Sequence, residues 1–356
     1  MIQSAGYEAD VIVVDNGSAD RSAERAIAAG ARVIKEPSRG YGRAIRTGIE
    51  NAKGSIIFMA DADGTYELAR IPEFIRYITD GSSDLVIGNR YHDIKKGAMP
   101  PLHRYVGTPF LSLLMKILFK TGVKDVNCGM RAFTRNAYQK LNLVTTGMEF
   151  ASEMVIRAIN LRLNIQEVDF AYLPRIGESK LRTVRDGLRH LRLMLLYSPD
   201  FMYMIPALIF WIVGATIVVI LFPQPLTIGT RNIDYHTMFV GAILNLGGLY
   251  LGSLGIIAKA YGHFAGLRLD RLISMWSARL KLKHGLYTGL AFFLMGLVYF
   301  LVVVVGWFRA GFGDIAHIRE LILGLVCLSN GMVLIATSFI LSLMVIPHTG
   351  EKSPFR

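Results

Sequence analysis

The chain has 356 residues, of which 52% are hydrophobic and only 19% are charged. Soluble globular proteins usually carry about 25% charged residues, and this composition excludes a disordered, collagen-like or coiled-coil chain. The two cysteines, Cys128 and Cys327, can form neither a disulfide framework nor a C-x-x-C metal motif. The formal net charge of +12 calls for an anionic partner, which can be nucleic acid, a membrane surface or a phosphorylated substrate.

Strand-like and helix-like segments alternate through the first half of the chain. The predicted strands are Val11–Val14, Ala31–Ile34, Ser55–Ala60 and Asp84–Gly88, and the predicted helices are Ala44–Ala52 and Ile71–Ile78. This alternation predicts an α/β fold with a mostly parallel sheet and flanking helices, whose ligands lie outside the carboxyl ends of the strands. The polar residues at these strand ends are Asp15, Asp61, Asp63 and Arg90.

Asp61 and Asp63 form an Asp-x-Asp motif directly after a strand that is predicted to be buried, and Gly64 follows them. Two such carboxylates make a hard-oxygen site for Mg²⁺ or Mn²⁺, which keeps water ligands and completes its shell with phosphate oxygens. A metal ion there would neutralise a diphosphate leaving group. Because Asp-x-Asp is a short motif, the alternative that both residues only shape a turn stays open.

Four long apolar runs dominate the second half of the chain. They span approximately Phe201–Phe222, Met238–Ala260, Leu286–Phe308 and Leu321–Ile346. Each run exceeds the ~20 residues that a helix needs to cross ~30 Å of hydrocarbon. We therefore predict an all-α transmembrane domain of about four helices over residues 200–348, rather than helices buried in a large soluble core.

Basic residues gather beside these apolar runs. Cations outnumber acids in the segment 175–199 and in the loop 262–284, whereas the other two loops are balanced. The positive-inside rule therefore predicts a multi-pass protein of the plasma membrane or its equivalent, with residues 1–174, both basic segments and the tail 349–356 in the cytoplasm. Apolar residues at helical spacing in both basic segments predict amphipathic helices on anionic lipid headgroups, and charge placed there argues against nucleic acid as the partner.

Seven motifs occur in order within residues 9–195. They are VIVVDNGSADRS, RGYGRAIRTGIENAKG, FMADADGTYE, DLVIGNRY, DVNCGMRAFTR, GMEFASEM and RIGESK. Together they resemble the family 2 glycosyltransferases of GT-A fold, and more narrowly the polyprenyl-phosphate hexosyltransferases, the group of dolichyl-phosphate mannose and glucose synthases. The membrane half resembles this family only in general character.

The resemblance implies two sets of residues around a nucleotide-sugar donor. The first set would contact the nucleotide, and the second would hold Mg²⁺ or Mn²⁺ on the diphosphate. The implied donor-binding residues are Asp15, Gly40, Gly42, Arg43 and Asp61, and the implied metal ligands are Asp61 and Asp63. An ordinary glycine turn is the alternative explanation of the two glycines.

On the acceptor side, the resemblance implies polar and basic residues that hold the phosphate of a polyprenyl-phosphate lipid. They are Arg90, Arg104, Arg175, Ser179 and Lys180. Two guanidinium groups converging on one phosphomonoester are sound chemistry. The implied catalytic residues are Asp63, Asp125 and Arg90. Asp125 either positions the nucleophile or caps a turn, and Glu153 either orients arginines in the site or is an ordinary helix residue.

The implied reaction moves a hexose from a nucleotide-diphosphate sugar to dolichyl or undecaprenyl phosphate with inversion at the anomeric carbon. The second pKa of a phosphomonoester is about 6, so at about pH 7 the acceptor is mostly dianionic and is already a nucleophile. No strong general base is then required. The work of the protein is positioning and charge stabilisation.

Two alternatives remain open. A membrane glycosyltransferase with a hydroxyl acceptor, on a glycolipid or polysaccharide, would need Asp125 or Glu153 as a carboxylate base. The second alternative is a non-catalytic nucleotide-sugar-binding membrane protein. Members of the family begin with a strand and a Pro-x-x-Asn-Glu-like segment that helps to bind the nucleotide, and we expect that this first strand is missing before Val11. Loss of that strand would favour binding without catalysis. The sequence leaves open the sugar, the nucleotide and a homo-oligomeric state.

Overall fold

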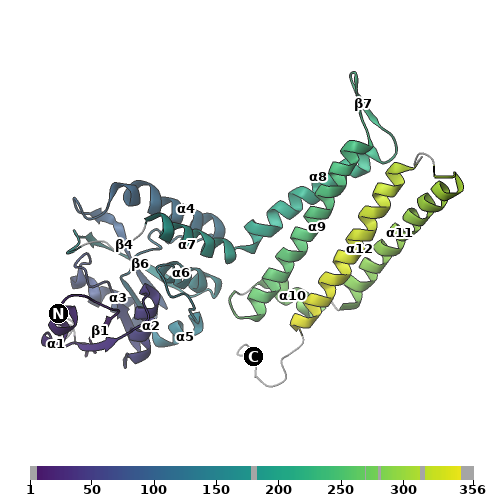
Figure 1. The fold of residues 1–356 in the computed structure, drawn as a ribbon. Coiled ribbons are helices and arrows are strands. Elements are labelled where there is room, and N and C mark those ends of the chain that lie inside the picture. Colours follow the sequence, from purple (N-terminus) through teal and green to yellow (C-terminus); the bar gives the residue numbers. More distant parts are fainter. Residues whose placement is uncertain (1–5, 178–182, 269, 280–281, 313–316, 346–356) are drawn as a thin grey trace. The chain divides into compact units, whose positions relative to one another are not determined.

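The computed structural model describes residues 6–177, 183–268, 270–279, 282–312 and 317–345 (Figure 1). The chain divides into two compact units, Met1–Ser198 and Pro199–Arg356. The first unit contains strands and helices, and the second consists mainly of long helices.

A four-stranded sheet of order β3-β5-β4-β6 forms the centre of the first unit. Its strands are β3 (Ile56–Met59), β4 (Leu85–Ile94), β5 (Arg131–Thr134) and β6 (Ile165–Tyr172). β5 runs antiparallel to both of its neighbours and β4 runs parallel to β6, so three of the four strands point the same way. A separate parallel pair joins β1 (Ile12–Asp15) to β2 (Arg32–Lys35). The predicted α/β class is confirmed.

Helices flank these sheets. They are α1 (Ser22–Ala28), α2 (Tyr41–Asn51), α3 (Ile71–Thr79), α4 (Thr108–Phe119), α5 (Arg135–Leu141), α6 (Phe150–Asn160) and α7 (Thr183–Leu196), with short helical turns at Leu68–Arg70 and His103–Gly107. α3 shows why the sequence folds this way, because its buried residues recur at helical spacing: Ile71, Phe74, Ile75 and Ile78. Burial of each such side chain contributes about 1.5–3 kcal/mol.

The two sheets of this unit are not joined by strand pairing. Within the described ranges, β1 pairs only with β2 and β3 only with β5. β1 and β3 therefore each have one edge without a strand partner. The backbone N–H and C=O groups on that edge must form hydrogen bonds with other groups or with water. Our expectation that a first strand is missing from this chain stays a prediction.

Buried polar contacts hold α7 against α6. The Ser152 hydroxyl lies 2.7 Å from His190 Nδ1 and 3.1 Å from the side-chain oxygen of Asn127, in the loop after α4. Near the end of α7, the Tyr197 hydroxyl donates to Glu153 and accepts from Arg157 Nε. The apolar spacing of Leu181, Val184, Leu188 and Leu191 predicted a helix on the lipid surface, and Leu188 is 59% exposed. A different pair on α7, Leu193 and Met194, packs in the core of the domain, and lipid contact of the outer face stays a prediction.

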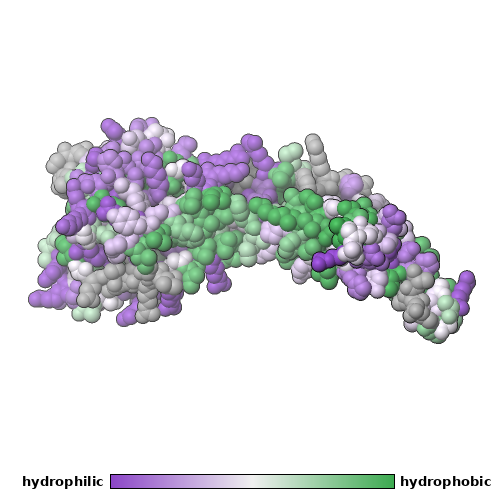
Figure 2. Space-filling view, turned by 90° about the horizontal axis from the view of Figure 1, so that it is seen from above, coloured by the Kyte–Doolittle hydropathy of each residue, from purple (hydrophilic) through white to green (hydrophobic). Residues whose placement is uncertain are grey.

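Among its described residues, the second unit has four helices that are long and apolar enough to cross a membrane. These candidate spans are Asp200–Leu221, Tyr235–Phe264, His284–Arg309 and Ile318–Met344. The helices of this unit are α8 (Ile205–Leu221), α9 (Tyr235–Phe264), α10 (Arg271–Arg279), α11 (Leu282–Arg309) and α12 (Ile318–Val345), and a hairpin of β7 (Leu226–Ile228) and β8 (Arg231–Ile233) connects α8 to α9. Figure 2 shows hydrophobic residues along the visible face of these helices. The prediction of four membrane helices is confirmed.

Four charged residues form a compact ion network in the second unit. Lys259 Nζ lies 2.7 Å from Asp200 and 3.3 Å from Asp270, and Arg268 Nη2 lies 3.3 Å and 3.4 Å from the same two carboxylates. Arg268, one of the cations of the basic loop 262–284, and Lys259 on α9 thus have acidic partners. The network ties the start of the first candidate span to the connection between α9 and α10.

Glycines let the membrane helices touch backbone to backbone. A Cβ atom added at Gly296 on α11 would lie 2.4 Å from Leu328 N and 2.6 Å from Gly324 O on α12. One polar pair also crosses between helices, because the buried Asn330 side chain on α12 donates a 2.9 Å hydrogen bond to Asn245 on α9. Close small-residue contacts and interhelical hydrogen bonds are the main attractions available in lipid.

Gly296→Ala should therefore destabilise the helical unit, because the added methyl group meets backbone atoms that cannot move independently. Overpacking of this kind costs about 1–3 kcal/mol. Thermal unfolding of the purified full chain in detergent should show a lower melting temperature. Gly306→Ala on the same helix is the control, since a Cβ there meets nothing within 4 Å. Equal shifts for the two variants would contradict the close packing.

Burial lowers the pKa of His190, an effect that the charges of Glu149 and Asp186 oppose. The unfolded chain then binds a proton near the ordinary pKa of about 6.5 while the folded chain does not, so stability is full above this pH and falls below it. His190→Asn keeps a short polar group toward Ser152 but cannot titrate. Melting temperatures at about pH 7.5 and about pH 5.5 should differ less for His190→Asn than for the unmodified chain or for His236→Asn, a change of an exposed histidine. An unchanged difference in His190→Asn would contradict the prediction.

Candidate active site

Asp61 follows β3 and lies in a tight cluster of tyrosines. Its carboxylate accepts a 3.0 Å hydrogen bond from the Tyr66 hydroxyl, whose oxygen in turn accepts from the Gly129 N–H at 2.9 Å. A Cβ at Gly129 would lie 2.7 Å from Asp61 Oδ2 and 3.0 Å from the Tyr41 hydroxyl, so only glycine lets this loop approach Asp61. Burial raises the pKa of Asp61, and the negative charge of Asp63 adds to the shift.

Asp63 is engaged on both of its carboxylate oxygens. Oδ1 accepts hydrogen bonds from the Thr65 N–H at 3.1 Å and the Thr65 hydroxyl at 2.6 Å, and Oδ2 lies 2.9 Å from Arg175 Nη2. The segment after β6 runs along this turn, because Leu173 N–H donates to Thr65 O and Ile176 N–H to Asp63 O. Arg175 was predicted to hold the acceptor phosphate. In the structure it forms an ion pair with Asp63, which was predicted to be a metal ligand. Ser179 and Lys180 lie outside the described residues.

Asp61 and Asp63 fit a divalent cation as the two protein ligands of a mostly phosphate and water shell. The described part of the chain contains no group of three or more metal-ligating side chains, and no ion pair is recorded for Asp61 within it. The half-buried Asp61 carboxylate, whose pKa is raised and whose recorded hydrogen bond among the described residues comes from the Tyr66 hydroxyl, is a group that a cation would stabilise in its charged form. At Asp63, Arg175 supplies positive charge.

Arg90 and Asp125 form a buried, bidentate ion pair. Arg90 Nε and Nη2 lie 2.6 Å and 2.7 Å from the two oxygens of Asp125, and the Arg90 N–H donates to the same carboxylate at 3.1 Å. The Asp125 side chain is fully buried and that of Arg90 is 11% exposed. Removing one partner of such a pair costs about 3–5 kcal/mol. Arg90, predicted to grip a phosphate, therefore already holds a carboxylate.

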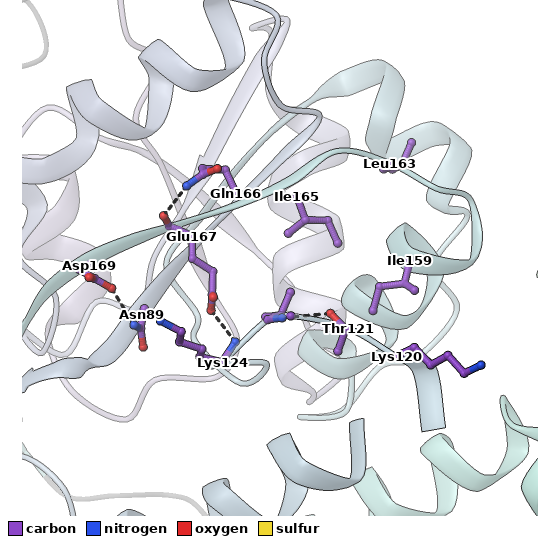
Figure 3. Close-up of a pocket in the computed structure, with 12 residues that line it drawn as sticks. Asn89, Lys120, Thr121, Lys124, Ile159, Leu163, Ile165, Gln166, Glu167 and Asp169 are labelled. Carbon is purple, nitrogen blue, oxygen red and sulfur yellow. Dashed lines mark hydrogen bonds between the residues drawn. The ribbon is translucent and has the colours of Figure 1, made fainter. Parts of the chain in front are cut away.

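Glu167 on β6 fixes the backbone on which Asp125 is carried. Its Oε1 accepts from the N–H groups of Lys124 and Asp125 at 2.8 Å and 3.1 Å. Figure 3 shows Glu167 and Lys124 at the wall of a cavity of about 600 Å³, together with Asn89, whose side chain donates to Asp169. Burial raises the pKa of Glu167. Sequence reasoning missed this residue, because a lone acid in a strand carries no motif.

Arg131 holds the loop 125–129 through hydrogen bonds to backbone carbonyl groups. Its fully buried guanidinium donates three 2.8 Å hydrogen bonds to the backbone carbonyl groups of Cys128, Val126 and Ala151. Cys128 packs in the core, and burial raises its pKa to about 12, so its thiol stays protonated. The loop 125–129 is thus held rigidly between Arg90 at its start and Asp61 at its end.

On the predicted donor side, Asp15 shapes a turn and Asn16 ties two loops together. Asp15 Oδ1 accepts a 2.8 Å hydrogen bond from the Ser18 N–H, which lowers the pKa of Asp15. Asn16 donates to the carbonyl groups of Glu36 and Ser38 and accepts from the Gly40 N–H, each at 2.8 Å. Asn16 was not singled out in the sequence. Its position beside Asp15 at a strand end was the available signal.

The two predicted donor-site glycines face a neighbouring loop. A Cβ at Gly40 would lie 2.4 Å from Thr146 O, and one at Gly42 would lie 2.8 Å from Thr145 O. Glycine is therefore required there for the start of α2 to pack against the loop 145–147. Arg43 is exposed on the same turn. Contact of these residues with a nucleotide stays a prediction.

Glu153 and Arg104 differ sharply in their surroundings. Glu153 is fully buried and accepts hydrogen bonds from the Val144 N–H, the Thr145 N–H and hydroxyl, and Tyr197. It holds the loop that contacts Gly40 and Gly42 and lies 3.5 Å from Arg157 Nε, and no contact with Arg90 is recorded for it among the described residues. Arg104 is partly exposed, its guanidinium lies 5.4 Å from the centre of the Tyr105 ring, and no ion pair is recorded for it among the described residues.

Two clusters therefore stand next to each other: Asp61 and Asp63 with Arg175, and Asp125 with Arg90, joined by the short loop 125–129. Tyr41 and Tyr66 were missed in the sequence, although both lie inside the quoted motifs. Burial raises the pKa of both tyrosines well above the ordinary value, so their hydroxyls remain donors. Asp61 and Asp63 thus lie beside Arg175 and beside the hydroxyl groups of Tyr41 and Tyr66.

Two family models match this chain. The model described as glycosyl transferase family 2 matches residues 2–141, and the model described as the glycosyltransferase family 2 C-terminal transmembrane region matches residues 256–345. A solved structure of glucosyl-3-phosphoglycerate synthase from Mycobacterium tuberculosis, with Mn²⁺, uridine diphosphate and glucosyl-3-phosphoglycerate, is 21% identical, covers 53% of this chain and 68% of its own, and has a TM-score of 0.43.

Two curated relatives come from Haloferax volcanii. The low-salt glycan biosynthesis hexosyltransferase Agl6 is 32% identical over 331 residues, which cover 93% of this chain and 80% of that protein. A dolichyl-phosphate hexose transferase is 37% identical over 181 residues, which cover 50% of this chain and 76% of that protein. With four membrane-length helices behind a matching α/β unit, the chain belongs to glycosyltransferase family 2 and is a membrane glycosyltransferase.

Proposed function

We propose that this glycosyltransferase moves a hexose from a nucleotide-diphosphate sugar to a polyprenyl phosphate, dolichyl or undecaprenyl, at the cytoplasmic face and with inversion. The names of the relatives support the hexose and the lipid phosphate, since one is a dolichyl-phosphate hexose transferase and another a dolichyl-phosphate beta-glucosyltransferase. The balance of cations between the loops supports the cytoplasmic side.

This proposal rests mainly on one observation: both carboxylates that could act as a general base, Asp125 and Glu153, are buried and hydrogen-bonded within the domain. A hydroxyl acceptor would need a carboxylate to take its proton. Asp125 is fully buried and bound at both oxygens by Arg90, and Glu153 is fully buried among backbone N–H groups, Thr145 and Tyr197. The oxygens of both carboxylates are thus already engaged by hydrogen bonds within the domain, and an acceptor hydroxyl would have to displace one of them. A phosphate acceptor needs no base, because it arrives as an anion.

Arginines remain to bind that anion. Arg104 forms no ion pair that the structure records among the described residues, so its charge is available without breaking an existing contact. Arg90 keeps one terminal nitrogen beyond the two atoms that hold Asp125. Their task is to hold the phosphate while its oxygen attacks the anomeric carbon, which is positioning rather than proton transfer.

Asp61 and Asp63 would hold Mg²⁺ or Mn²⁺, which supplies charge neutralisation for the departing diphosphate. The chain's own residues prepare this site. Tyr66 and Gly129 hold the Asp61 carboxylate in place, and Thr65 holds that of Asp63. Arg175, at 2.9 Å from Asp63, places a further positive charge beside the same diphosphate position.

The central experiment incubates membranes containing the full chain with radiolabelled nucleotide sugars and three acceptors. Transfer of label to polyprenyl phosphate, but not to the matching polyprenol or to a glycolipid, is the expected result. Transfer to the polyprenol instead would overturn the phosphate acceptor. Nucleotide-sugar binding without transfer to any acceptor would support the non-catalytic alternative.

Arg104→Ala should weaken binding of the lipid phosphate. A lost charge-assisted hydrogen bond costs about 1.5–3 kcal/mol, which raises KM for polyprenyl phosphate by about tenfold or more and leaves KM for the nucleotide sugar unchanged. Arg76→Ala is a matched control, because Arg76 also lies over the ring of the next residue, 5.5 Å from the centre of Tyr77. A larger loss in Glu153→Gln than in Arg104→Ala would favour the hydroxyl acceptor.

Asp63→Asn should lower kcat by about 100-fold and raise the Mn²⁺ concentration needed for half-maximal transfer, because the amide is a poor ligand for a hard cation. Asp80→Asn is the control, since Asp80 Oδ1 accepts from Ser82 N–H two residues on, as Asp63 does from Thr65. Full turnover in Asp63→Asn, or turnover unaffected by a chelator, would contradict the metal site.

A further inference from the structure

The central sheet is interrupted at the position that carries Arg90. β4 pairs with β6 in parallel register from Leu85 to Asn89, the register then shifts, and pairing resumes at Asp93. On its other side, β4 is paired with β5 from Leu85 to Ile87. Within the described strands, Arg90 therefore lies in a bulge where neither neighbouring strand is paired with it. Bulges of this kind re-aim a side chain next to an active site, and the N–H group that they free needs another acceptor.

Asp125 supplies the support that the sheet does not give to Arg90. Its Oδ2 accepts the Arg90 N–H at 3.1 Å, a bond that a strand partner would otherwise make, and its two oxygens hold the edge of the guanidinium. The face of the guanidinium lies over the ring of Tyr172, with 5.3 Å between Arg90 Cζ and the ring centre. The backbone and the side chain of Arg90 are thus both placed by Asp125, which belongs to a loop and not to the sheet.

Glu167 connects that loop back to the sheet. It lies on β6 before the bulge, opposite Ile87, and its Oε1 accepts the N–H groups of Lys124 and Asp125. Hydrogen bonds to an ionised acceptor are about twice as strong as neutral ones. The strand therefore places Arg90 by a route around the bulge, from Glu167 to the backbone of Asp125 and from the Asp125 carboxylate to Arg90.

Other contacts hold the loop on both sides of Asp125. Before it, the Ser112 hydroxyl donates to the carbonyl of Lys124. After it, Arg131 donates to the carbonyls of Val126 and Cys128. These bonds do not involve Glu167, so its replacement should change the orientation of Asp125 without unfolding the loop.

The Glu167 carboxylate can be reached by solvent from behind the loop. It lines the cavity of about 600 Å³ in Figure 3 together with Lys120 at the end of α4, Lys124 on the loop and Asp169 on β6. Burial raises the pKa of Glu167, and the charge of Asp125 adds to the shift, while the two N–H groups and the charge of Lys124 oppose it. Protonation would remove the charge that strengthens both hydrogen bonds to the loop.

We propose that Glu167 is a positioning residue for the acceptor phosphate, which keeps Arg90 in its binding geometry by holding the backbone of Asp125. This inference rests on the proposed function, because it takes Arg90 to be a ligand of the lipid phosphate. The physical link from Glu167 to Arg90 is the same whichever acceptor is used.

The first test measures KM values in the transfer assay with polyprenyl phosphate. Glu167→Ala removes both hydrogen bonds and should raise KM for polyprenyl phosphate by about tenfold, with KM for the nucleotide sugar unchanged. Glu167→Gln keeps an acceptor oxygen without the charge and should raise the same KM by about threefold. Asp84→Ala is the matched control and should change neither KM, because Asp84 also accepts a backbone N–H, that of Asn164, but lies at the opposite end of β4.

The second test measures KM for polyprenyl phosphate from about pH 8 down to about pH 5. The acceptor takes up its own proton near about pH 6, so this KM rises on acidification in every form of the chain. In the unmodified chain, protonation of Glu167 should add a further rise. Glu167→Gln resembles the protonated state at every pH, so its profile should show the titration of the acceptor alone. Parallel profiles in the two forms would overturn the positioning role, which a purely structural role of Glu167 would also produce.

The third test follows the loop without any acceptor, by hydrogen exchange of the purified full chain. Glu167→Ala should speed exchange in peptides that contain Asp125 and in those that contain Arg90, and Asp84→Ala should not. Unchanged exchange, or KM values that rise together for both substrates, would overturn the proposal. If the unmodified chain transfers no hexose to polyprenyl phosphate, the proposed function fails and the phosphate role fails with it, while hydrogen exchange still decides the link from Glu167 to Arg90.

Discussion

The buried pair of Arg90 and Asp125 is the interaction on which the rest of the site depends. The fully buried Asp125 carboxylate needs a polar partner, and two parallel hydrogen bonds from Arg90 at 2.6 Å and 2.7 Å provide it. Glu167 and Arg131 then fix the backbone on either side of Asp125, and Gly129 brings the far end of the loop to Asp61. One ion pair thereby fixes the loop that separates Arg90 from Asp61.

Both arginines nearest the predicted metal and acceptor positions are bound to carboxylates. Arg175 contacts Asp63 and Arg90 contacts Asp125, so the site is nearly neutral although the chain carries a net charge of +12. An incoming diphosphate with its cation would compete for Asp63 and release positive charge. The net charge of +12 therefore comes from cations outside these two pairs.

The sequence was sufficient for the α/β class, the four membrane helices and the family, because each rests on a pattern that runs over many residues. It failed for contacts that depend on tertiary distance. A lone Glu167 or Asn16 has no local signal, and the pairing of Arg175 with Asp63 joins residues more than a hundred positions apart. α7 illustrates the limit: helical spacing singled out Leu188 and Leu191, but only the fold shows that Leu193 and Met194 are the residues that pack in the core. The roles of individual site residues stay predictions.

The contacts from His190 through Ser152 to Asn127 connect α7 to the loop that carries Asp125. α7 continues within a few residues into the first membrane-length helix, and Asn127 lies two residues after Asp125. A displacement of α7 would have to break these contacts or move the loop that carries Asp125. The loop beside the two glycines is linked to the same region, because Tyr197, directly after α7, donates to Glu153, which accepts from the Thr145 N–H. Movement of this one helix would therefore be felt at both predicted halves of the site.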